Sequence, residues 1–198
     1  MPKSKNLLAT SILFVFSFVV ALAASEVVLR IKNSSMKNHD IEIWRYAKEL
    51  QISSDNQFLG HEHINSASAT LQSVEIRFNR WGLRGGSLAP PKDGVRRILF
   101  LGSSVTLGWG VAEDKTMTSV LEDMFRQSDR EVEVLNAGIG NYNTVRYVER
   151  FHKRLVELKP TDLVVHYFVN DAEILEAGPG NSLLRNSQLA FTLWLSAH

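Results

Sequence analysis

The sequence predicts an α/β fold in which helices cover both faces of a parallel sheet. Short runs that are almost wholly apolar occur at 98–101, 132–135 and 163–169, and stretches with helical apolar spacing separate them. Strands that are apolar at nearly every position are typical of parallel sheets buried on both faces, whereas half-exposed strands alternate. Composition agrees, because 44% of the 198 residues are hydrophobic and 22% are charged, as in ordinary globular proteins.

Composition also excludes several classes of protein. The formal net charge is +1, so no basic surface argues for a nucleic-acid partner. The chain has no cysteine, which excludes a disulfide framework, a thiolate nucleophile and a thiolate metal site. Its length suits one domain preceded by a leader.

The N-terminus predicts a membrane-spanning helix. An uncharged run from Leu7 to Ser25 is dense in large apolar side chains, and about 20 such residues suffice to cross a bilayer. Lys3 and Lys5 precede the run, which favours a cytoplasmic N-terminus and a remainder on the periplasmic or extracellular side. We therefore expect a cytoplasmic tip at 1–6 and a signal anchor over 7–29.

A cleaved signal peptide is the alternative for this segment. Ala21 and Ala23 have the spacing of a signal-peptidase site. Two features favour the uncleaved anchor: the apolar run is longer than is typical of a signal peptide, and apolar character resumes at Val27-Val28-Leu29. Either interpretation predicts export.

A mixed prelude is expected over residues 31–94. His39–Leu50 predicts a short helix, and residues 51–72, rich in Ser, Asn and His, predict a loop. Val74–Phe78 alternates strictly, as a half-buried strand does. A stretch rich in proline, ending at Gly94, is the strongest linker signal in the chain.

The α/β domain is expected over residues 95–198. Helical apolar spacing recurs over Met117–Phe125 and Val145–Leu158, and Pro160 must end the second helix. Right-handed crossovers through these helices would make the three strands parallel. Apolar residues from Leu183 to Trp194 predict a further helix.

The residues that follow the three strands form the candidate site, because ligands of open α/β sheets bind beyond the carboxyl ends of the strands. The first strand ends in Gly102-Ser103-Ser104-Val105-Thr106, the second in Asn136-Ala137-Gly138-Ile139-Gly140-Asn141-Tyr142-Asn143, and the third in Asn170-Asp171. A serine hydroxyl can attack an acyl carbonyl when a base accepts its proton. Glycine N–H groups and an asparagine side chain can stabilise the resulting oxyanion.

Three segments at these strand ends resemble the SGNH (GDSL-type) hydrolase family. They are block I (LGSSVTLGWGV, 101–111), block II (NAGIGNYNT, 136–144) and block III (VND, 169–171). The segment NRWGLRG at 79–85 resembles one that precedes block I in exported members. The resemblance covers roughly residues 75–175, and it implies a three-layer αβα, flavodoxin-like parallel sheet of which only the first three strands are present.

Site roles follow from the resemblance residue by residue. Ser104 matches the nucleophile. The backbone N–H of Ser104, the N–H of Gly140 and the side chain of Asn170 match the three oxyanion donors. Gly138 and Asn141 lie in the same turn as Gly140 and are alternatives to it. The resemblance implies no metal or organic cofactor.

The chain departs from the family pattern in two places. Ser103 stands where the family usually has Asp, which is expected to alter loop hydrogen bonds more than chemistry. The family's general base is a histidine in an Asp-x-x-His motif, but the only histidine after block III is His198, and Leu195 stands where the Asp would be. His152 is expected in mid-helix and His166 inside a strand, one face away from the site, so neither is expected to serve.

Without a base, the nucleophile is an ordinary alcohol, because general-base catalysis typically contributes about 10² to 10⁴ in rate. We therefore expect the 198-residue chain to be inactive alone. It is interpreted as the N-terminal part of a longer enzyme or as a natural truncation.

Simpler interpretations exist for the same residues. Ser104 could merely cap a helix, and Asn170-Asp171 could be an ordinary turn. Gly138-Ile139-Gly140 lacks the third glycine of a dinucleotide-binding motif. His61-Glu62-His63 is expected to hold solvated loop histidines instead of metal ligands. Trp109 is expected in the core, although it could line an acyl or sugar pocket.

The leading functional hypothesis is an exported, membrane-anchored serine ester hydrolase of SGNH type that acts on an envelope or extracellular ester. Its partners would be an acylated small molecule or glycan and the membrane. An O-acyl transferase acting on an exopolysaccharide is the first alternative, because the two activities differ only in what attacks the acyl-enzyme. A non-catalytic, truncated envelope protein is the second.

Overall fold

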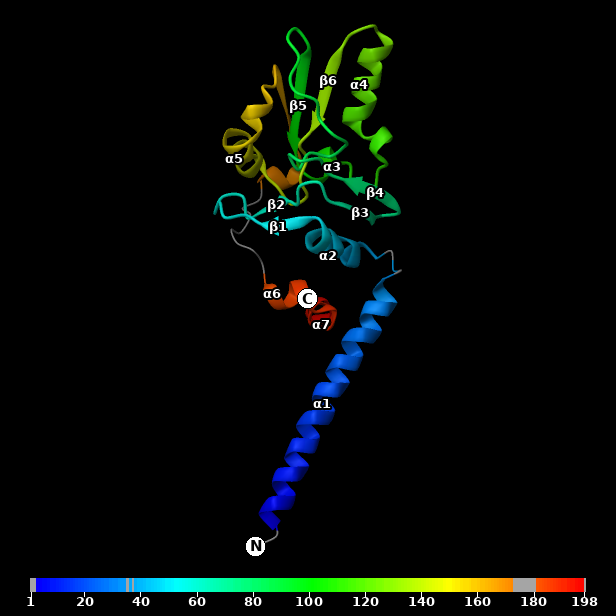
Figure 1. Ribbon diagram of the computed structural model, residues 1–198, viewed down its shortest axis with the longest axis vertical. Coiled ribbons are helices and arrows are strands. Elements are labelled where there is room, and N and C mark those ends of the chain that lie inside the picture. The colour runs from blue at the N-terminus through cyan, green and yellow to red at the C-terminus, as the bar shows by residue number, and fades with distance from the viewer. Residues whose placement is uncertain (1–2, 35, 37, 173–180, 198) are drawn as a thin grey trace. The chain divides into compact units, whose positions relative to one another are not determined.

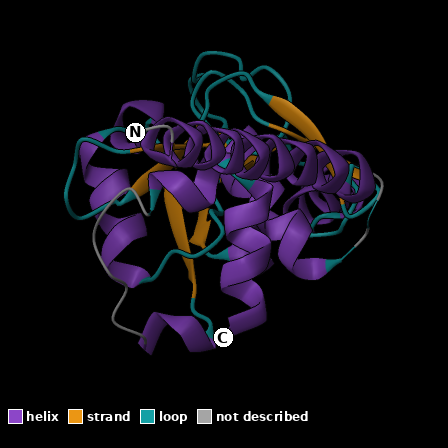
Figure 2. Cartoon of the chain, turned by 90° about the horizontal axis from the view of Figure 1, so that it is seen from below, coloured by secondary structure: helices purple, strands orange, loops and turns teal. Residues whose placement is uncertain are grey.

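A computed structural model describes residues 3–34, 36, 38–172 and 181–197. The chain divides into two compact units. One unit is Glu42–Pro179, which contains all the described strands. The other combines Met1–Ile41 with Gly180–His198 and is helical. Figures 1 and 2 show the helices, strands and loops of the described chain.

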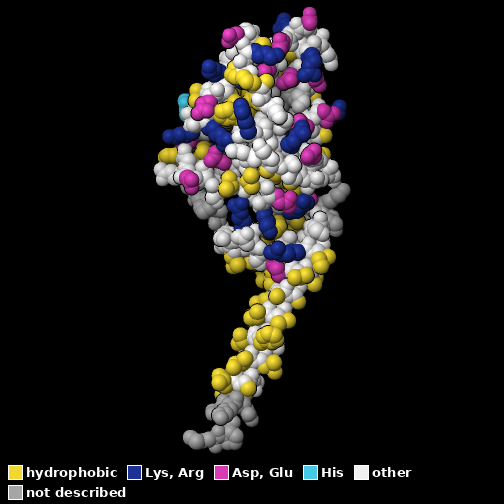
Figure 3. Space-filling model, in the orientation of Figure 1, with side chains coloured by type: hydrophobic (Ala, Val, Ile, Leu, Met, Phe, Trp, Pro, Cys, Tyr) yellow, Lys and Arg dark blue, Asp and Glu magenta, His cyan; other side chains and the backbone are white. Residues whose placement is uncertain are grey.

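The helical unit contains α1 (Lys3–Asn33), α6 (Ser182–Asn186) and α7 (Gln188–Ala197). Within α1, Leu7–Asn33 is long and apolar enough to cross a membrane, and none of its apolar window is buried. Exposed apolar side chains occur along this helix from Leu7 to Ile31, and Figure 3 shows such side chains on its described part. An apolar N-terminal helix is therefore confirmed. The helix expected from Leu183 to Trp194 is two helices, since Ser187 has extended backbone between them.

The central sheet has three parallel strands, β5 (Arg96–Gly102), β6 (Val132–Asn136) and β7 (Asp162–His166), in the order β6-β5-β7. Leu99 of β5 lies opposite Leu135 of β6 and Leu163 of β7. The sequence prediction of a parallel α/β sheet is confirmed. The third predicted strand was too long, because β7 ends at His166 and Val169 begins the 3₁₀-helix η3 (Val169–Ala172).

Two apolar clusters bury β5 and β6. On one face, the cluster around Leu99, Leu101 and Leu135 includes Tyr147 of α5 (Thr144–Lys153) and the 3₁₀-helix η2 (Leu155–Leu158). On the other face, Ile98, Phe100 and Val134 pack with Leu121 and Phe125 of α4 (Met117–Gln127). Figure 1 shows the sheet between α4 and α5.

The edge strand β7 departs from the expectation that both faces are covered. Leu163 is 45% exposed and Val165 is 49% exposed. They share a face with Leu99 and Leu101, their partners in β5. The buried cluster on that face includes those two β5 residues and none from β7. The apolar run at 163–169 therefore reflects an edge strand buried mainly on one side.

The prelude contains more regular structure than its composition predicts. It holds α2 (His39–Glu49) and two antiparallel hairpins, β1 (Gln51–Ser53) with β2 (His61–His63) and β3 (Ser68–Leu71) with β4 (Val74–Arg77). The prediction of a loop over 51–72 was wrong. These strands are three or four residues long, and each packs into the interior through one buried side chain, such as His63 in β2 and Leu71 in β3. Such runs are too short for alternation to show.

The prelude and the α/β sheet form one packed unit. Tyr46, Leu71 and Phe78 of the prelude are buried in one cluster with Leu107, the last residue of the short helix α3 (Ser104–Leu107). Leu59 and Leu83 join the cluster on the α5 side of the sheet. The prelude therefore packs against the short helix that begins at Ser104.

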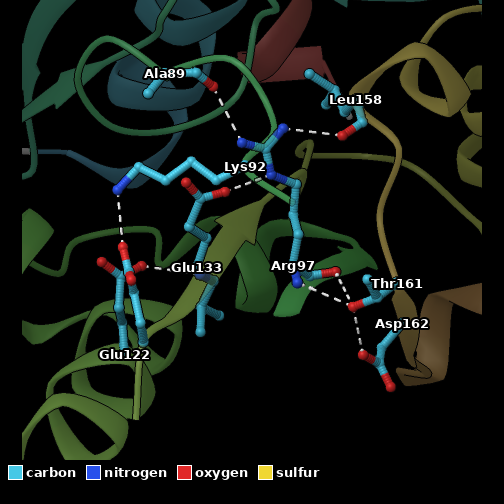
Figure 4. A network of polar contacts seen from close by, with 10 residues as sticks. Ala89, Lys92, Arg97, Glu122, Glu133, Leu158, Thr161 and Asp162 are labelled. Carbon is cyan, nitrogen blue, oxygen red and sulfur yellow. Dashed lines mark hydrogen bonds and ion pairs between the residues drawn. The ribbon is translucent and has the colours of Figure 1, made fainter. Parts of the chain in front are cut away.

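A buried arginine closes the amino end of the sheet (Figure 4). Arg97 is 2% exposed, and its guanidinium donates to the Glu133 carboxylate and to the backbone carbonyls of Leu158 (2.9 Å) and Ala89 (3.0 Å). This network joins β5, β6, η2 and the linker. The three blocks lie at the other, carboxyl end of the same strands.

Candidate active site

Ser104 lies at the start of a one-turn helix directly after the central strand. β5 ends at Gly102, Ser103 is the N-cap residue with extended backbone, and Ser104 is the first residue of α3. Ser104 is half-buried, and its Oγ makes no hydrogen bond within the described residues. The capping interpretation does not hold, since Ser103 occupies the cap position and makes no side-chain cap hydrogen bond.

Block II packs directly against α3. The Ile139 N–H donates to the Gly102 carbonyl (3.0 Å), and Asn136 Nδ2 donates to the Thr106 carbonyl (2.7 Å). A Cβ placed on Gly138 would lie 2.1 Å from the Leu107 nitrogen, which is far inside contact distance. Glycine at this position is therefore what allows block II to touch the backbone of α3.

Arg84, from the segment that precedes block I, holds the other end of α3. It is 6% exposed, and its Nη1 donates to the carbonyls of Leu107 (2.6 Å) and Gly108 (2.5 Å). Its Nη2 donates to the Val111 carbonyl. These groups include carbonyls that the end of a helix leaves without an intrahelical partner. The prelude thus fixes the short helix that begins at Ser104.

Block III reaches block II through Asp171. Asp171 Oδ1 accepts hydrogen bonds from the hydroxyls of Thr144 (2.7 Å) and Tyr147, and Oδ2 accepts the Phe168 N–H (2.7 Å). Burial raises the pKa of Asp171, but these hydrogen bonds outweigh it and leave the pKa below its ordinary value. Asn170 belongs to η3, and its side chain lies outside the described part of the structure.

His166 lies at the site, contrary to the sequence interpretation. It is the last residue of β7, opposite Gly102, and its Nδ1 lies 2.9 Å from Thr106 Oγ1 of α3. The interpretation failed because the apolar run continues to Val169 and so places His166 in mid-strand. His152 is exposed in the last turn of α5 and not in mid-helix as expected, because α5 ends at Lys153. His198 lies outside the described residues. In the described part of the chain, no histidine is hydrogen-bonded to Ser104.

The peptide groups of the block II turn differ in what they bind. The Gly138 N–H donates to Asn136 Oδ1 (3.0 Å), and the Gly140 N–H donates to Tyr46 Oη (3.0 Å). Asn141 follows with φ 59°, and its N–H has no acceptor among the described residues. The Gly140 N–H, matched to an oxyanion donor from the sequence, is therefore engaged in the interior.

Two histidines of the β2 strand act on Gly140. His61 Nε2 lies 2.9 Å from the Gly140 carbonyl oxygen, to which it must donate. His63 acts through Tyr46: its Nδ1 lies 2.9 Å from the Gly82 carbonyl, and its Nε2 lies 2.6 Å from Tyr46 Oη. Because a carbonyl only accepts, His63 carries its proton on Nδ1, and Tyr46 donates to Nε2 while accepting the Gly140 N–H.

Burial keeps the hydrogen-bonded pair of His63 and Tyr46 uncharged. His63 is 2% exposed and stacks on Phe78 with ring centroids 3.6 Å apart. Burial lowers the pKa of His63 well below its ordinary value, and burial raises the pKa of Tyr46 to about 12. A neutral imidazole and a neutral phenol are the forms that the hydrogen-bond directions require.

This state of His63 predicts a loss of stability in acid. The unfolded chain protonates His63 as the pH falls below about 6.5, but the folded chain does not, so the unfolding free energy falls by at most about 1.4 kcal/mol per pH unit. The loss ends at the folded pKa. Urea unfolding between pH 7.5 and 5.5 measures it, and imidazole ¹⁵N shifts identify the group. A folded-state His63 signal that titrates near pH 6.5 would contradict the assignment.

Sequence reasoning missed Tyr46, His61, His63 and Arg84 as parts of this site. His61 and His63 were expected to be solvated, but both lie in β2 and hold the block II turn. The sequence feature that could have indicated this is that the two histidines are two residues apart, which puts both side chains on one face of a strand. No group of three or more potential metal ligands gathers in the described part of the chain.

The fold and the site together define an α/β protein with a serine at the start of the short helix that follows its central strand. No family model matches the chain, and no curated protein matches it. The crystal structure of AlinE4, an SGNH-hydrolase family esterase, is similar at 24% sequence identity over 51% of this chain, with a TM-score of 0.32. The match covers 49% of that structure, so this chain spans about half its length.

Proposed function

We propose that this protein is a serine ester hydrolase of SGNH type with Ser104 as the nucleophile. The observation that carries the proposal is a half-buried serine at the start of α3 whose hydroxyl no described residue engages. Block II packs on α3, and block III is hydrogen-bonded to block II through Asp171 and Thr144. The β6-β5-β7 order supports a flavodoxin-like sheet, since it matches the second-first-third order with which such sheets begin.

The reaction would proceed through an acyl-enzyme. Ser104 Oγ attacks the ester carbonyl carbon while a general base takes its proton, and the C–O bond to the alcohol breaks as the alcohol leaves with a proton. Water then attacks the acyl-enzyme and releases the acid. The N–H of Ser104, at the open end of α3, can stabilise the oxyanion of both steps. We assign no described histidine to the role of base.

For the second oxyanion donor we propose the Asn141 N–H, one of the three candidates of the turn. The N–H groups of Gly138 and Gly140 already have acceptors. In a trans peptide, the N–H of Asn141 points opposite to the Gly140 carbonyl, and that carbonyl faces His61. The Asn141 N–H therefore points away from the prelude. The Asn170 side chain remains the proposed third donor.

His61 is then a positioning residue, because it orients the peptide that carries this N–H. We expect His61→Ala to lower kcat by about tenfold or more, since losing one oxyanion donor outright costs about 10² to 10³. KM should change little, and His61→Gln should restore part of kcat because its amide can donate to the same carbonyl. Steady-state kinetics on a soluble ester checks this. A tenfold change in KM with an unchanged kcat would contradict this role of His61.

The test of the function is a pair of adjacent serine variants in the protein expressed from its complete gene. Ser104→Ala should reduce hydrolysis of p-nitrophenyl acetate by about a thousand-fold or more. Ser103→Ala is the matched control: Ser103 is 1% exposed, and its Oγ has no partner among the described residues, so hydrolysis should stay within about threefold. Turnover that survives in Ser104→Ala would refute the nucleophile, and a wild type without turnover would favour a non-catalytic protein.

The acyl acceptor is proposed to be water, with a glycan hydroxyl as the alternative. Mass analysis of an acetylated glycan, incubated with and without a donor ester, separates them. Acetate released from the glycan supports the hydrolase. Acetyl groups gained by an unacetylated glycan only when the donor is present support the transferase.

For location, we propose that α1 anchors the protein and that the folded domain lies on the periplasmic or extracellular side. Length and apolar surface of α1 support the anchor, and Lys3 and Lys5 ahead of the apolar run support the orientation. Alkaline phosphatase fused after residue 172 should be active in a bacterial host. An inactive phosphatase fusion together with a fluorescent GFP fusion at the same site would contradict the proposed orientation, because the domain would then lie in the cytoplasm.

A further inference from the structure

The chain offers a second surface to the membrane besides α1. We propose that α7 is an interfacial helix that lies on the bilayer surface, docked to α1 at the level where α1 leaves the hydrocarbon core. The partner that this surface fits is the lipid headgroup and acyl-chain boundary. The inference rests on α1 as a membrane anchor and not on the esterase site.

The docking contact is a carboxylate of α1 at the N-terminus of α7. Glu26 accepts hydrogen bonds from the backbone N–H groups of Gln188 (3.1 Å) and Leu189 (2.9 Å) and from Ser187 Oγ (2.9 Å). A carboxylate at this position satisfies N–H groups that have no partner inside the helix, and it complements the helix dipole. Asn33 Nδ2 adds a hydrogen bond to Gln188 Oε1 (3.0 Å), which is buried.

The depth of this contact follows from the geometry of α1. From Leu7 to Glu26 the helix rises about 29 Å, at 1.5 Å per residue. The hydrocarbon core of a bilayer is about 30 Å thick. An apolar run that enters the core at Leu7 therefore leaves it near Glu26. Arg30 lies one turn further, where it pairs with Glu26 (2.8 Å) and donates to the Asn186 carbonyl (3.0 Å).

The composition of α7 fits a lipid boundary and not water. Its ten residues, QLAFTLWLSA, carry no charge. At about 15 Å the helix is too short to span a bilayer. Gln188 is buried and bonded to Asn33 of α1, and Thr192 follows one turn later on the same face of the helix. Leu193 and Trp194 lie on other faces and are 62% and 43% exposed. Tryptophan is enriched at the membrane interface, where its ring has one apolar and one polar end.

A spin label can test this placement cleanly, because the chain has no cysteine. The full chain with Leu193→Cys is labelled with a nitroxide and reconstituted in phosphatidylcholine–phosphatidylglycerol vesicles. Phe16→Cys in the apolar run of α1 serves as the lipid reference, and Asp129→Cys in the folded domain serves as the water reference. Collision rates with oxygen, which partitions into lipid, and with a water-soluble nickel chelate then report depth.

The expected oxygen-to-nickel ratio at position 193 lies well above that at 129 and below that at 16. A ratio equal to that at 129 would overturn the proposal, and so would a label shielded from both reagents, because protein would then cover α7. A water-like label at position 16 would overturn it as well, since α1 would not be in the bilayer. Trp194→Cys repeats the measurement on the same face in case the first variant does not fold.

A second variant tests the docking contact. Glu26→Ala removes the acceptor of the hydrogen bonds from Ser187, Gln188 and Leu189, so the label at 193 should become more mobile, with a narrower spectrum. Glu49→Ala is the control, because that glutamate belongs to the other compact unit and pairs with Arg45 in α2. An unchanged spectrum in Glu26→Ala would overturn the docking role of Glu26.

Discussion

Replacing Gly138 with alanine should destabilise the folded domain by about 3 kcal/mol or more, at the upper end of overpacking effects. The new Cβ would lie 2.1 Å from the Leu107 nitrogen and 2.7 Å from both the Leu107 Cα and the Thr106 carbonyl carbon. These are backbone atoms, so no side-chain rotation relieves the clash. Block II and α3 must separate, which displaces Ser104, and ester hydrolysis should fall with stability. Urea unfolding followed by tryptophan fluorescence measures the first effect.

Gly86→Ala is the matched control for this substitution. The nearest atom to a Cβ at position 86 is Arg77 Nη2, at 3.7 Å, and the backbone there is outside the left-handed region. Alanine should therefore be neutral or should stabilise by up to about 1 kcal/mol, since it restricts the unfolded chain. If the two variants unfold at the same urea concentration, block II does not pack on α3 as described.

Replacing Arg84 with methionine should cost about 3 kcal/mol, because hydrogen bonds to a charged group contribute about 1.5 to 3 kcal/mol. Methionine fills similar space but leaves the carbonyls of Leu107, Gly108 and Val111 without their donor. The C-terminal end of α3 should loosen. Hydrogen exchange of the amides in residues 104–111 should quicken, and kcat should fall more than KM rises. Arg84→Lys should restore little, because an ammonium cannot reproduce the planar fork of donors.

Arg80→Met tests whether this effect belongs to the buried guanidinium. Arg80 lies four residues earlier in the same segment, is exposed, and has its guanidinium 5.7 Å from the Trp81 ring. Its loss should cost less than about 1 kcal/mol, as expected for an exposed cation–π contact. Comparable losses for both variants would mean that charge in the segment, and not the contacts with α3, stabilises the domain.

The sequence predicted the elements with strong periodicity and the meeting of blocks I and II at one edge of the sheet. The stripe over Met117–Phe125 became α4, and the apolar runs near 98 and 132 became β5 and β6. These patterns extend over several turns of a helix or along a whole strand, although only Leu121 and Phe125 of the α4 stripe pack on the sheet. Met117, Val120 and Met124 are exposed. Blocks I and II each follow a strand, and parallel strands have their carboxyl ends at one edge of the sheet, so the sequence predicted that the two blocks lie together.

What the sequence could not predict depends on contacts between distant residues. The short strands β1 to β3 are stabilised by pairing and by single buried side chains, which leave no periodic pattern. Gly140 was a reasonable donor from its position in the turn, but Tyr46, 94 residues away, accepts its N–H. The roles of His61 and His63 were equally hidden, since they require the hairpin that brings β2 beside the turn.

The central claim is that Ser104 forms the acyl-enzyme, and a covalent probe tests it most directly. The protein expressed from its complete gene is incubated with a fluorophosphonate, digested, and mapped by mass spectrometry. The account predicts one adduct on Ser104, retained in Ser103→Ala and absent in Ser104→Ala. An adduct on another residue, or ester turnover with Ser104 unmodified, would contradict it.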